Sequence, residues 1–165
     1  MNNLILTSVK KLLHLSPDLI HSQLFDETTF YPQLLKDLKQ CKKEVIIESP
    51  FIASQRMCSL IRTFETLVAK KVKIYIITRD PDDHNLIMKQ QAETEIRRFE
   101  TMGIQVLVTN NFSHRKLAIL DRKVLWEGSL NILSQNFSRE IMRRIESEAH
   151  ARECFRFVDF GKFIY

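Results

Sequence analysis

The sequence predicts an α/β domain in which helices flank a mixed, mostly parallel central sheet. Between residues 44 and 109, three short apolar runs of strand length alternate with two amphipathic stretches of helical periodicity. The 165 residues, 44% of them hydrophobic and 27% charged, match one globular domain, because chains divide into domains of about 100 to 200 residues. We expect this domain to span residues 28–165, and a helical extension with a linker to precede it over residues 1–27.

Apolar spacing places the first elements in order. Residues 4–15 have helical periodicity, and the mixed stretch 16–29 that follows is predicted to be a linker. Another helix begins after Pro32, and its apolar face consists of Leu34, Leu35, Leu38 and Cys41. Residues 44–48 are a short apolar run, typical of a strand, that ends before Pro50.

The alternation continues with two more helices and two more strands. A helix begins at Ser54, and residues 72–78 form the next predicted strand. A further amphipathic stretch ends at Gly103, a residue type that commonly ends helices, and residues 104–109 follow as a strand. Helical crossovers make such strands parallel, and ligands bind beyond the carboxyl ends of the strands. We therefore expect the functional site just after Glu48, Thr78 and Thr109.

The last elements follow a different pattern. Residues 114–120 and 124–128 are strand-like and a tight turn joins them, which predicts a hairpin that is added to the sheet. Residues 140–145 are expected to form a further strand, and residues 146–160 a closing helix.

Charge and composition limit the class of partner. The net charge of +5 and an isoelectric point near 9.2 favour an anionic partner such as nucleic acid or an acidic membrane surface. The three cysteines lie far apart, which indicates reduced thiols and neither a disulfide framework nor a zinc site. The N-terminus lacks the pattern of a secretory signal, and no run of about 18 apolar residues is long enough to span a bilayer. We expect a cytoplasmic protein without integral membrane association.

Two short motifs carry the chemistry. Residues His114, Lys116 and Asp121 have the spacing H-x-K-x4-D, and a G-S-x-N sequence starts at Gly128, at the end of the next predicted strand. Together the two motifs resemble the phospholipase D superfamily, and the order of strands and helices over most of residues 42–150 resembles it as well. The resemblance implies a phospholipase D-like fold and phosphodiester chemistry.

These residue types suit phosphodiester chemistry without a metal or a cofactor. A strand's period of two places His114 and Lys116 on one face, so that a nucleophile and a cation lie together. Ser129 and Asn131 are predicted to donate hydrogen bonds to phosphate oxygens, and Gly128 to permit close approach. A turn and a helix cap are the alternative interpretation of Ser129 and Asn131.

The resemblance also implies a mechanism and an assembly. In the superfamily, a histidine attacks phosphorus to give a covalent phosphohistidine, and a histidine from a second copy of the motif protonates the leaving group. This chain has one copy, so the resemblance implies a homodimer in which two His114 side chains form one composite site. Glu140 is then the expected carboxylate that fixes each imidazole, although Ser138 stands where many relatives have Asn. Asp121 is included in the catalytic set, although its place at a hairpin corner favours a role in holding the turn and pairing with a nearby base.

Other side chains have competing interpretations. Arg139, Arg143 and Arg144 are predicted to bind substrate along a DNA groove, and a solvated surface is the equal alternative. Trp126 is predicted to be a core residue in preference to a base-stacking one. Residues 82–84, Asp-Asp-His, are expected to form a solvated loop and not a metal site.

The sequence therefore predicts a metal-independent phosphodiesterase, most simply a homodimeric DNA endonuclease that acts through a phosphohistidine. One alternative keeps the covalent histidine and assigns a phospholipid substrate. Another, from a different class, is a non-catalytic nucleic-acid-binding dimerisation module of a larger defence or helicase system.

Overall fold

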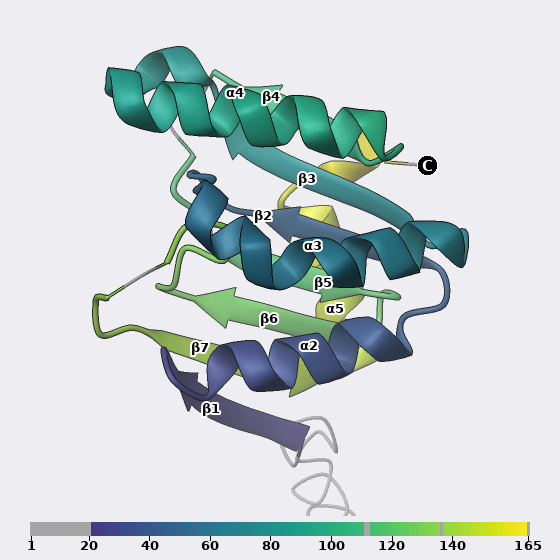
Figure 1. Ribbon diagram of the computed structural model, residues 1–165. Helices are drawn as coiled ribbons and strands as arrows, with labels where there is room; N and C mark the ends of the chain where they lie inside the picture. The colour runs from purple at the N-terminus through teal and green to yellow at the C-terminus, as the bar shows by residue number, and fades with distance from the viewer. Residues whose placement is uncertain (1–20, 111–112, 136, 165) are drawn as a thin grey trace, which may run out of the picture.

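A computed structural model of the chain describes residues 21–110, 113–135 and 137–164. A seven-stranded sheet in the order β1-β7-β6-β5-β2-β3-β4 forms the centre, with α2, α3 and α4 on one face and α5 on the other (Figure 1). The strands are β1 (Ser22–Asp26), β2 (Glu44–Glu48), β3 (Lys73–Arg79), β4 (Gln105–Thr109), β5 (Leu117–Leu120), β6 (Val124–Gly128) and β7 (Ile141–Glu146). The helices are α2 (Phe30–Gln40), α3 (Ser54–Ala69), α4 (Leu86–Thr101) and α5 (Glu148–Phe157), with 3-10 turns η2 (Pro81–Asp83) and η3 (Phe160–Lys162).

The strand directions confirm a mixed α/β sheet, but the prediction that it is mostly parallel is wrong. Only β2–β3 and β3–β4 pair in parallel, whereas β2–β5, β5–β6, β6–β7 and β1–β7 are antiparallel. The reason is the connection after β4. No described helix separates β4 from β5, so the chain enters β5 at the edge where β4 ended and must run in the opposite direction.

Each face of the sheet has its own apolar core. On the larger side, Ile47, Ile76 and Ala118 of the central strands pack under α2, α3 and α4. On the other side, Ile46 and Ile119 pack against the C-terminal segment that begins with α5. The central strands are apolar on both faces because helices cover both of them.

The first strand of the sheet was not expected from the sequence. Residues 22–26, predicted to be part of a linker, form β1 and pair antiparallel with β7. This edge strand buries little: Phe25 contacts Trp126 at a centroid distance of 4.9 Å, while Leu24 remains 59% exposed. A short edge strand with one inward apolar side chain gives only a weak periodic signal. The helix predicted over residues 4–15 lies outside the described residues.

The remaining elements follow the sequence prediction with shifted bounds. The hairpin is confirmed, although β5 begins at Leu117, three residues after His114. The further strand and the closing helix are confirmed as β7 and α5. Within the described chain, no helix has both the length and the apolar content needed to cross a membrane.

Candidate active site

His114 lies at one edge of the sheet, where several strand ends meet. The carboxyl ends of β2, β3 and β4 lie at this edge, β5 starts there, and β6 ends there, as the pairing of Leu117 with Glu48 and Glu127 shows. This is the edge at which the sequence predicted a ligand site. The His114 side chain is exposed, so its ring is accessible from solvent.

The loop that carries His114 is anchored by a buried carboxylate. Glu48, only 2% exposed at the end of β2, accepts hydrogen bonds from both residues that flank His114. Ser113 Oγ donates to Glu48 Oε1 at 2.5 Å, and Arg115 Nε donates to both carboxylate oxygens at 2.9 Å. Because a buried carboxylate is stable only when it is paired and hydrogen-bonded, this arrangement holds His114 at a fixed place on the edge.

The imidazole of His114 contacts an arginine at the carboxyl end of β3. Arg79, 8% exposed, places Nη1 at 3.2 Å from His114 Nε2, and its Nη2 donates to Asp83 Oδ2 at 3.4 Å. The Phe51 ring lies beside both groups, 6.0 Å from the His114 ring and 5.8 Å from the Arg79 guanidinium carbon. His84 also packs on Phe51, at 4.9 Å, and burial together with the nearby Arg79 charge lowers its pKa below the ordinary value.

Lys116 remains beside His114. Its Nζ donates to the carbonyl oxygen of His114 at 2.5 Å, and its own carbonyl accepts from the Gly128 backbone at 3.2 Å. The cation is therefore held at the same sheet edge as the imidazole. Packing explains why position 128 is a glycine, because a Cβ atom there would overlap the carbonyl oxygen of Ile141. Close approach at Gly128 is thus to β7, and the proposed role in binding substrate is not needed to explain it.

The G-S-x-N segment continues from β6 along the same edge. The Ser129 hydroxyl accepts from the Ile141 backbone at 3.1 Å and extends the contact between β6 and β7. The backbone carbonyl of Asn131 accepts from Ser134 and Gln135, so a single turn, and not a helix, starts at Asn131. Its side-chain Oδ1 is buried and has no hydrogen-bond partner among the described residues. Donation from Asn131 to a phosphate oxygen would come from its Nδ2 group, so this expected role stays a prediction.

Glu140 and Arg139 lie in a separate hollow next to this segment. They line a cavity of about 540 Å³ together with Ser129, Asp26 and Glu27. The Glu140 carboxylate accepts from Ser138 Oγ at 2.8 Å, and no hydrogen bond joins it to His114 in the described part of the chain. The expected role of Glu140 in fixing the imidazole therefore stays a prediction. Ser138, the departure from the family pattern, is the residue that engages it.

Asp121 lies at the opposite edge, away from His114. It follows β5 at the hairpin turn, and its carboxylate accepts from the backbone N–H groups of Lys42, Lys43 and Glu44 at 2.8 to 3.0 Å. The assignment of Asp121 to the catalytic set is not supported, because β5 carries the chain across the sheet between Lys116 and Asp121. Its alternative role, to hold the turn, is what the geometry shows.

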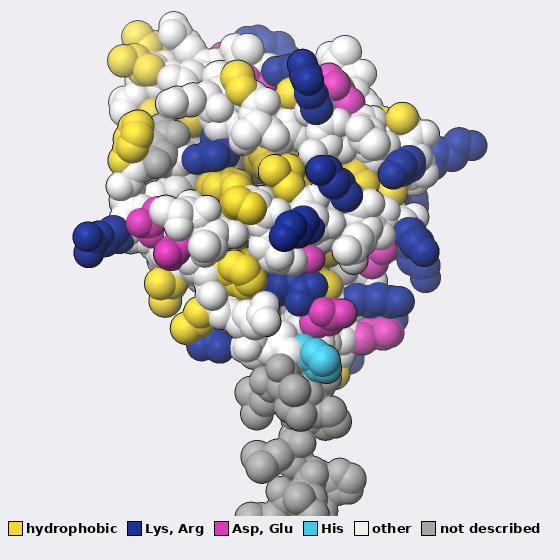
Figure 2. All heavy atoms as spheres, turned by 60° about the horizontal axis from the view of Figure 1, so that its bottom comes forward, with side chains coloured by type: hydrophobic (Ala, Val, Ile, Leu, Met, Phe, Trp, Pro, Cys, Tyr) yellow, Lys and Arg dark blue, Asp and Glu magenta, His cyan; other side chains and the backbone are white. Residues whose placement is uncertain are grey.

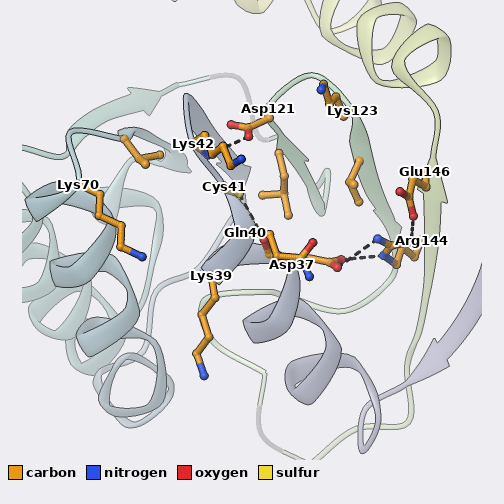
Figure 3. A pocket seen from close by; sticks show the side chains of 13 residues that line it. Asp37, Lys39, Gln40, Cys41, Lys42, Lys70, Asp121, Lys123, Arg144 and Glu146 are labelled. Atoms are coloured by element: carbon orange, nitrogen blue, oxygen red, sulfur yellow. Dashed lines mark hydrogen bonds and ion pairs between the residues drawn. The ribbon is translucent and has the colours of Figure 1, made fainter.

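Arg144 is also placed away from the edge that carries His114. Its guanidinium donates to the buried Asp37 at 2.7 and 3.1 Å and to Glu146 at 2.9 Å, and Figure 3 shows this network in a cavity at the Asp121 edge. Trp126, fully buried as predicted, donates to the same Asp37. The role of Arg144 in binding substrate stays a prediction, and in this structure β7 turns the side chain toward Asp37 of α2. Arg143, on the other face of β7, donates to Ser22 at 2.8 Å.

That cavity, the volume of which is about 720 Å³, is not the candidate active site. It lies at the edge opposite His114, and its acidic side chains hold structural contacts with Arg144 and with the backbone before β2. In the described chain, no three His, Cys, Asp or Glu side chains are grouped as metal ligands.

Sequence reasoning missed Arg79 as a neighbour of His114. The predicted strand ended one residue earlier, at Thr78. Because this strand end was expected to face the site, the charged residue directly after it could have been predicted as a site residue. The site was expected just after Glu48, and no contact of the Glu48 side chain itself was predicted. A carboxylate at the end of an apolar strand also indicates a buried polar contact.

The arrangement combines an imidazole with two cations, a guanidinium and an ammonium. An imidazole attacks electrophilic phosphorus, while a guanidinium and an ammonium balance the charge of phosphate oxygens. These are the parts of a phosphoryl-transfer site.

The sequence itself matches a known family. A family profile described as "Cardiolipin synthase, PLD-like domain" matches residues 34–157, which include His114, Lys116 and Asn131. The chain belongs to the phospholipase D superfamily. This family is of a phosphodiester-active type, and the match covers the whole site edge. A comparison with curated proteins finds no match.

The fold agrees with solved members of the superfamily. The phospholipase D family member Nuc from Salmonella typhimurium is 14% identical with a TM-score of 0.68, and 82% of this chain covers 90% of Nuc. NucT from Helicobacter pylori is 17% identical with a TM-score of 0.67, and 82% of this chain covers 91% of it. Phosphatidylserine synthase from Haemophilus influenzae Rd KW20 is 18% identical with a TM-score of 0.59, and 80% of this chain covers 36% of that protein.

Proposed function

We propose that the chain is a metal-independent phosphodiesterase, a DNA endonuclease that works as a homodimer through a phosphohistidine. The observation that carries this proposal is the sheet edge at which His114 is anchored by Glu48 on both sides, with Lys116 and Asn131 at the same edge. The enzyme acts in the cytoplasm in this proposal.

The reaction proceeds in two balanced steps. The Nε2 lone pair of one His114 attacks phosphorus, so that an N–P bond forms and the P–O bond to the leaving group breaks. The partner's His114, protonated, gives its proton to the leaving oxygen. It then takes a proton from water as the water oxygen attacks phosphorus, and the N–P bond breaks and returns its electron pair to the first imidazole. Lys116 and Arg79 balance the charge on the non-bridging oxygens.

Exposed apolar side chains around the site edge support the homodimer. Leu86 and Ile87, at the start of α4, are 69% and 68% exposed. Phe137, between β6 and β7, is 91% exposed, and Ile141, the first residue of β7, is 60% exposed. Both segments lie at the edge of the sheet that carries His114. Apolar side chains beside a polar site are typical of a surface that a partner covers, and a second copy here brings two His114 side chains together.

Charge and the similarity to Nuc and NucT support nucleic acid as the substrate. The chain carries a net charge of +5, and Figure 2 shows Lys and Arg side chains spread over the face in view, with fewer acidic ones among them. The fold is also more similar to Nuc and NucT, with TM-scores of 0.68 and 0.67, than to the phosphatidylserine synthase, with a TM-score of 0.59. The lipid alternative remains as a second proposal because that synthase shares the fold.

Plasmid cleavage in excess chelator tests the proposal. Wild-type protein is expected to nick or cut plasmid DNA, while His114→Ala is expected to lose activity by at least about a thousandfold. His21→Ala, an exposed histidine beside the far end of β1, is the matched control and should cut like wild type. A ³²P label that stays on denatured wild-type protein, and is absent from His114→Ala, would identify the covalent intermediate.

Other outcomes would redirect the proposal. Cleavage that needs a divalent cation, or that persists in His114→Ala, would contradict it. Headgroup release from phospholipid vesicles without DNA cleavage would support the lipid alternative. Tight DNA binding without any turnover would support a non-catalytic module. Light scattering that gives a monomer at assay concentration would remove the composite site.

A further inference from the structure

Arg79 engages the atom of His114 that the proposed reaction uses. Its Nη1 lies 3.2 Å from Nε2, which is within hydrogen-bond distance. A guanidinium is always protonated and can only donate, so Nε2 must be the acceptor in this contact. The neutral ring then carries its proton on Nδ1. The tautomer of His114 follows from the chemistry of its neighbour.

The guanidinium is itself held in place from several sides. Asp83 accepts from its Nη2 at 3.4 Å, and the Phe51 ring lies 5.8 Å from its central carbon. Phe51 also contacts the His114 ring at 6.0 Å, so one aromatic side chain positions both partners. With Arg79 only 8% exposed, the guanidinium has little freedom to leave this position without a new acceptor.

The carboxylate expected to orient the imidazole is engaged elsewhere. Glu140 accepts from Ser138 at 2.8 Å, and the buried Glu48 accepts from the two residues beside His114. Neither carboxylate has a hydrogen bond to the His114 ring in the part of the chain that the structure describes. The ring contact that sets the tautomer is therefore the one with Arg79.

We propose that Arg79 is the positioning residue of His114, which keeps Nε2 unprotonated at rest and moves onto a phosphate oxygen when a phosphodiester enters. This inference rests on the proposed function and names a residue that the family motif does not contain. The planar fork of a guanidinium matches two oxygens of a phosphate, so a bound phosphodiester is a better acceptor than a neutral imidazole nitrogen. The exchange frees the Nε2 lone pair at the moment when phosphorus is within reach.

The same exchange in the partner subunit completes the site. Release of the partner's His114 from its own arginine contact allows that ring to take a proton from solvent and then to donate it to the leaving oxygen. The two rings are equivalent at rest and differ only once phosphate is bound.

Nitrogen NMR of the histidine rings tests the proposal directly. Long-range proton–nitrogen spectra of ¹⁵N-labelled wild-type protein, with His114→Ala used for assignment, should show neutral His114 with its proton on Nδ1. In Arg79→Met the proton should move to Nε2, the tautomer that a free histidine side chain prefers. Arg97→Met, the same exchange at an exposed position on α4 with an ion pair to Glu93, is the control and should leave His114 unchanged.

Kinetics with bis(p-nitrophenyl) phosphate separate this inference from the proposed function. Arg79→Met should lower kcat by about a hundredfold, the usual effect of removing one preorganised donor, with a smaller rise in KM. A proton on Nε2 in the wild-type protein would overturn the role of Arg79, and this measurement needs no variant to fold. The expected tautomer without hydrolysis of any phosphodiester would support the contact and overturn the proposed function.

Discussion

Arg115 Nε donates to both oxygens of the Glu48 carboxylate at 2.9 Å, and this contact ties the loop before β5 to the buried end of β2. Ser113 donates to the same carboxylate, so the residue between them, His114, is anchored on both sides. The loop that carries the exposed His114 ring is thus attached to a carboxylate that is only 2% exposed. In the proposed reaction, such a rigid support favours precise attack of the imidazole on phosphorus.

Glu48→Gln should reduce activity more than it reduces substrate binding. The amide keeps the size of the carboxylate but loses the charge that faces Arg115, so the His114 loop gains freedom. We expect kcat to fall by about tenfold to a hundredfold, because small misplacements of a reacting group have effects of that size. Steady-state kinetics measure it. Glu127→Gln, on an exposed β6 position, is the matched control, and an unchanged kcat in Glu48→Gln would contradict this role of Glu48.

Arg144→Met should destabilise the fold without touching the active site. The substitution leaves the carboxylate of Asp37, whose side chain is 4% exposed, without its ion-pair partner, and breaking a buried pair costs about 3 kcal/mol. Urea unfolding measures the loss. The double variant Asp37→Leu with Arg144→Met should lose less than the sum of the single variants, since apolar side chains replace both charges. Additive losses would show that the pair is not coupled.

Asp121→Ala should lower stability by about 2 kcal/mol and leave the activity per folded molecule intact. Three backbone N–H groups lose a charged acceptor, and alanine is strained at the positive φ of 51° found here. Asp121→Asn, which tolerates this conformation and keeps one acceptor oxygen, should lose less. Thermal unfolding and plasmid cleavage are measured on both. A specific loss of kcat in Asp121→Asn would return this residue to the catalytic set.

Local patterns predicted most of the strands and helices. The strands and helices between residues 44 and 109 are found as expected, since burial on both faces of β2 and β3 produces the apolar runs that the sequence displays. The family resemblance rests on His114, Lys116 and the G-S-x-N segment, which the structure brings to one sheet edge. These residues are close in sequence, so a hairpin alone suffices to gather them.

Sequence spacing does not show at which edge of the sheet, or on which face of a strand, a side chain lies. Five residues of extended chain from Lys116 to Asp121 span roughly 16 Å, which is enough to reach the other edge of the sheet. The face of the sheet on which Arg144 lies depends on the register of β7 with β6. Arg79 and His114 are in contact although they are 35 residues apart in the sequence. Such contacts come from tertiary packing and have no periodic signature.

His84 should make stability depend on pH in the weakly acidic range. Its pKa is lowered from the ordinary value of 6.5, first by burial and then by the charge of Arg79, against the opposing effects of Asp83 and Asp80. Both ring nitrogens are buried without a hydrogen-bond partner in the described chain. Above the ordinary value the ring is neutral in the folded and unfolded states. As pH falls below it, the unfolded chain binds a proton that the folded protein refuses, so stability is lost down to the folded pKa and then levels off. Urea midpoints between about pH 7 and about pH 5 should therefore fall less steeply in His84→Gln than in wild type. An equal slope in the two proteins would mean that the buried ring does not contribute.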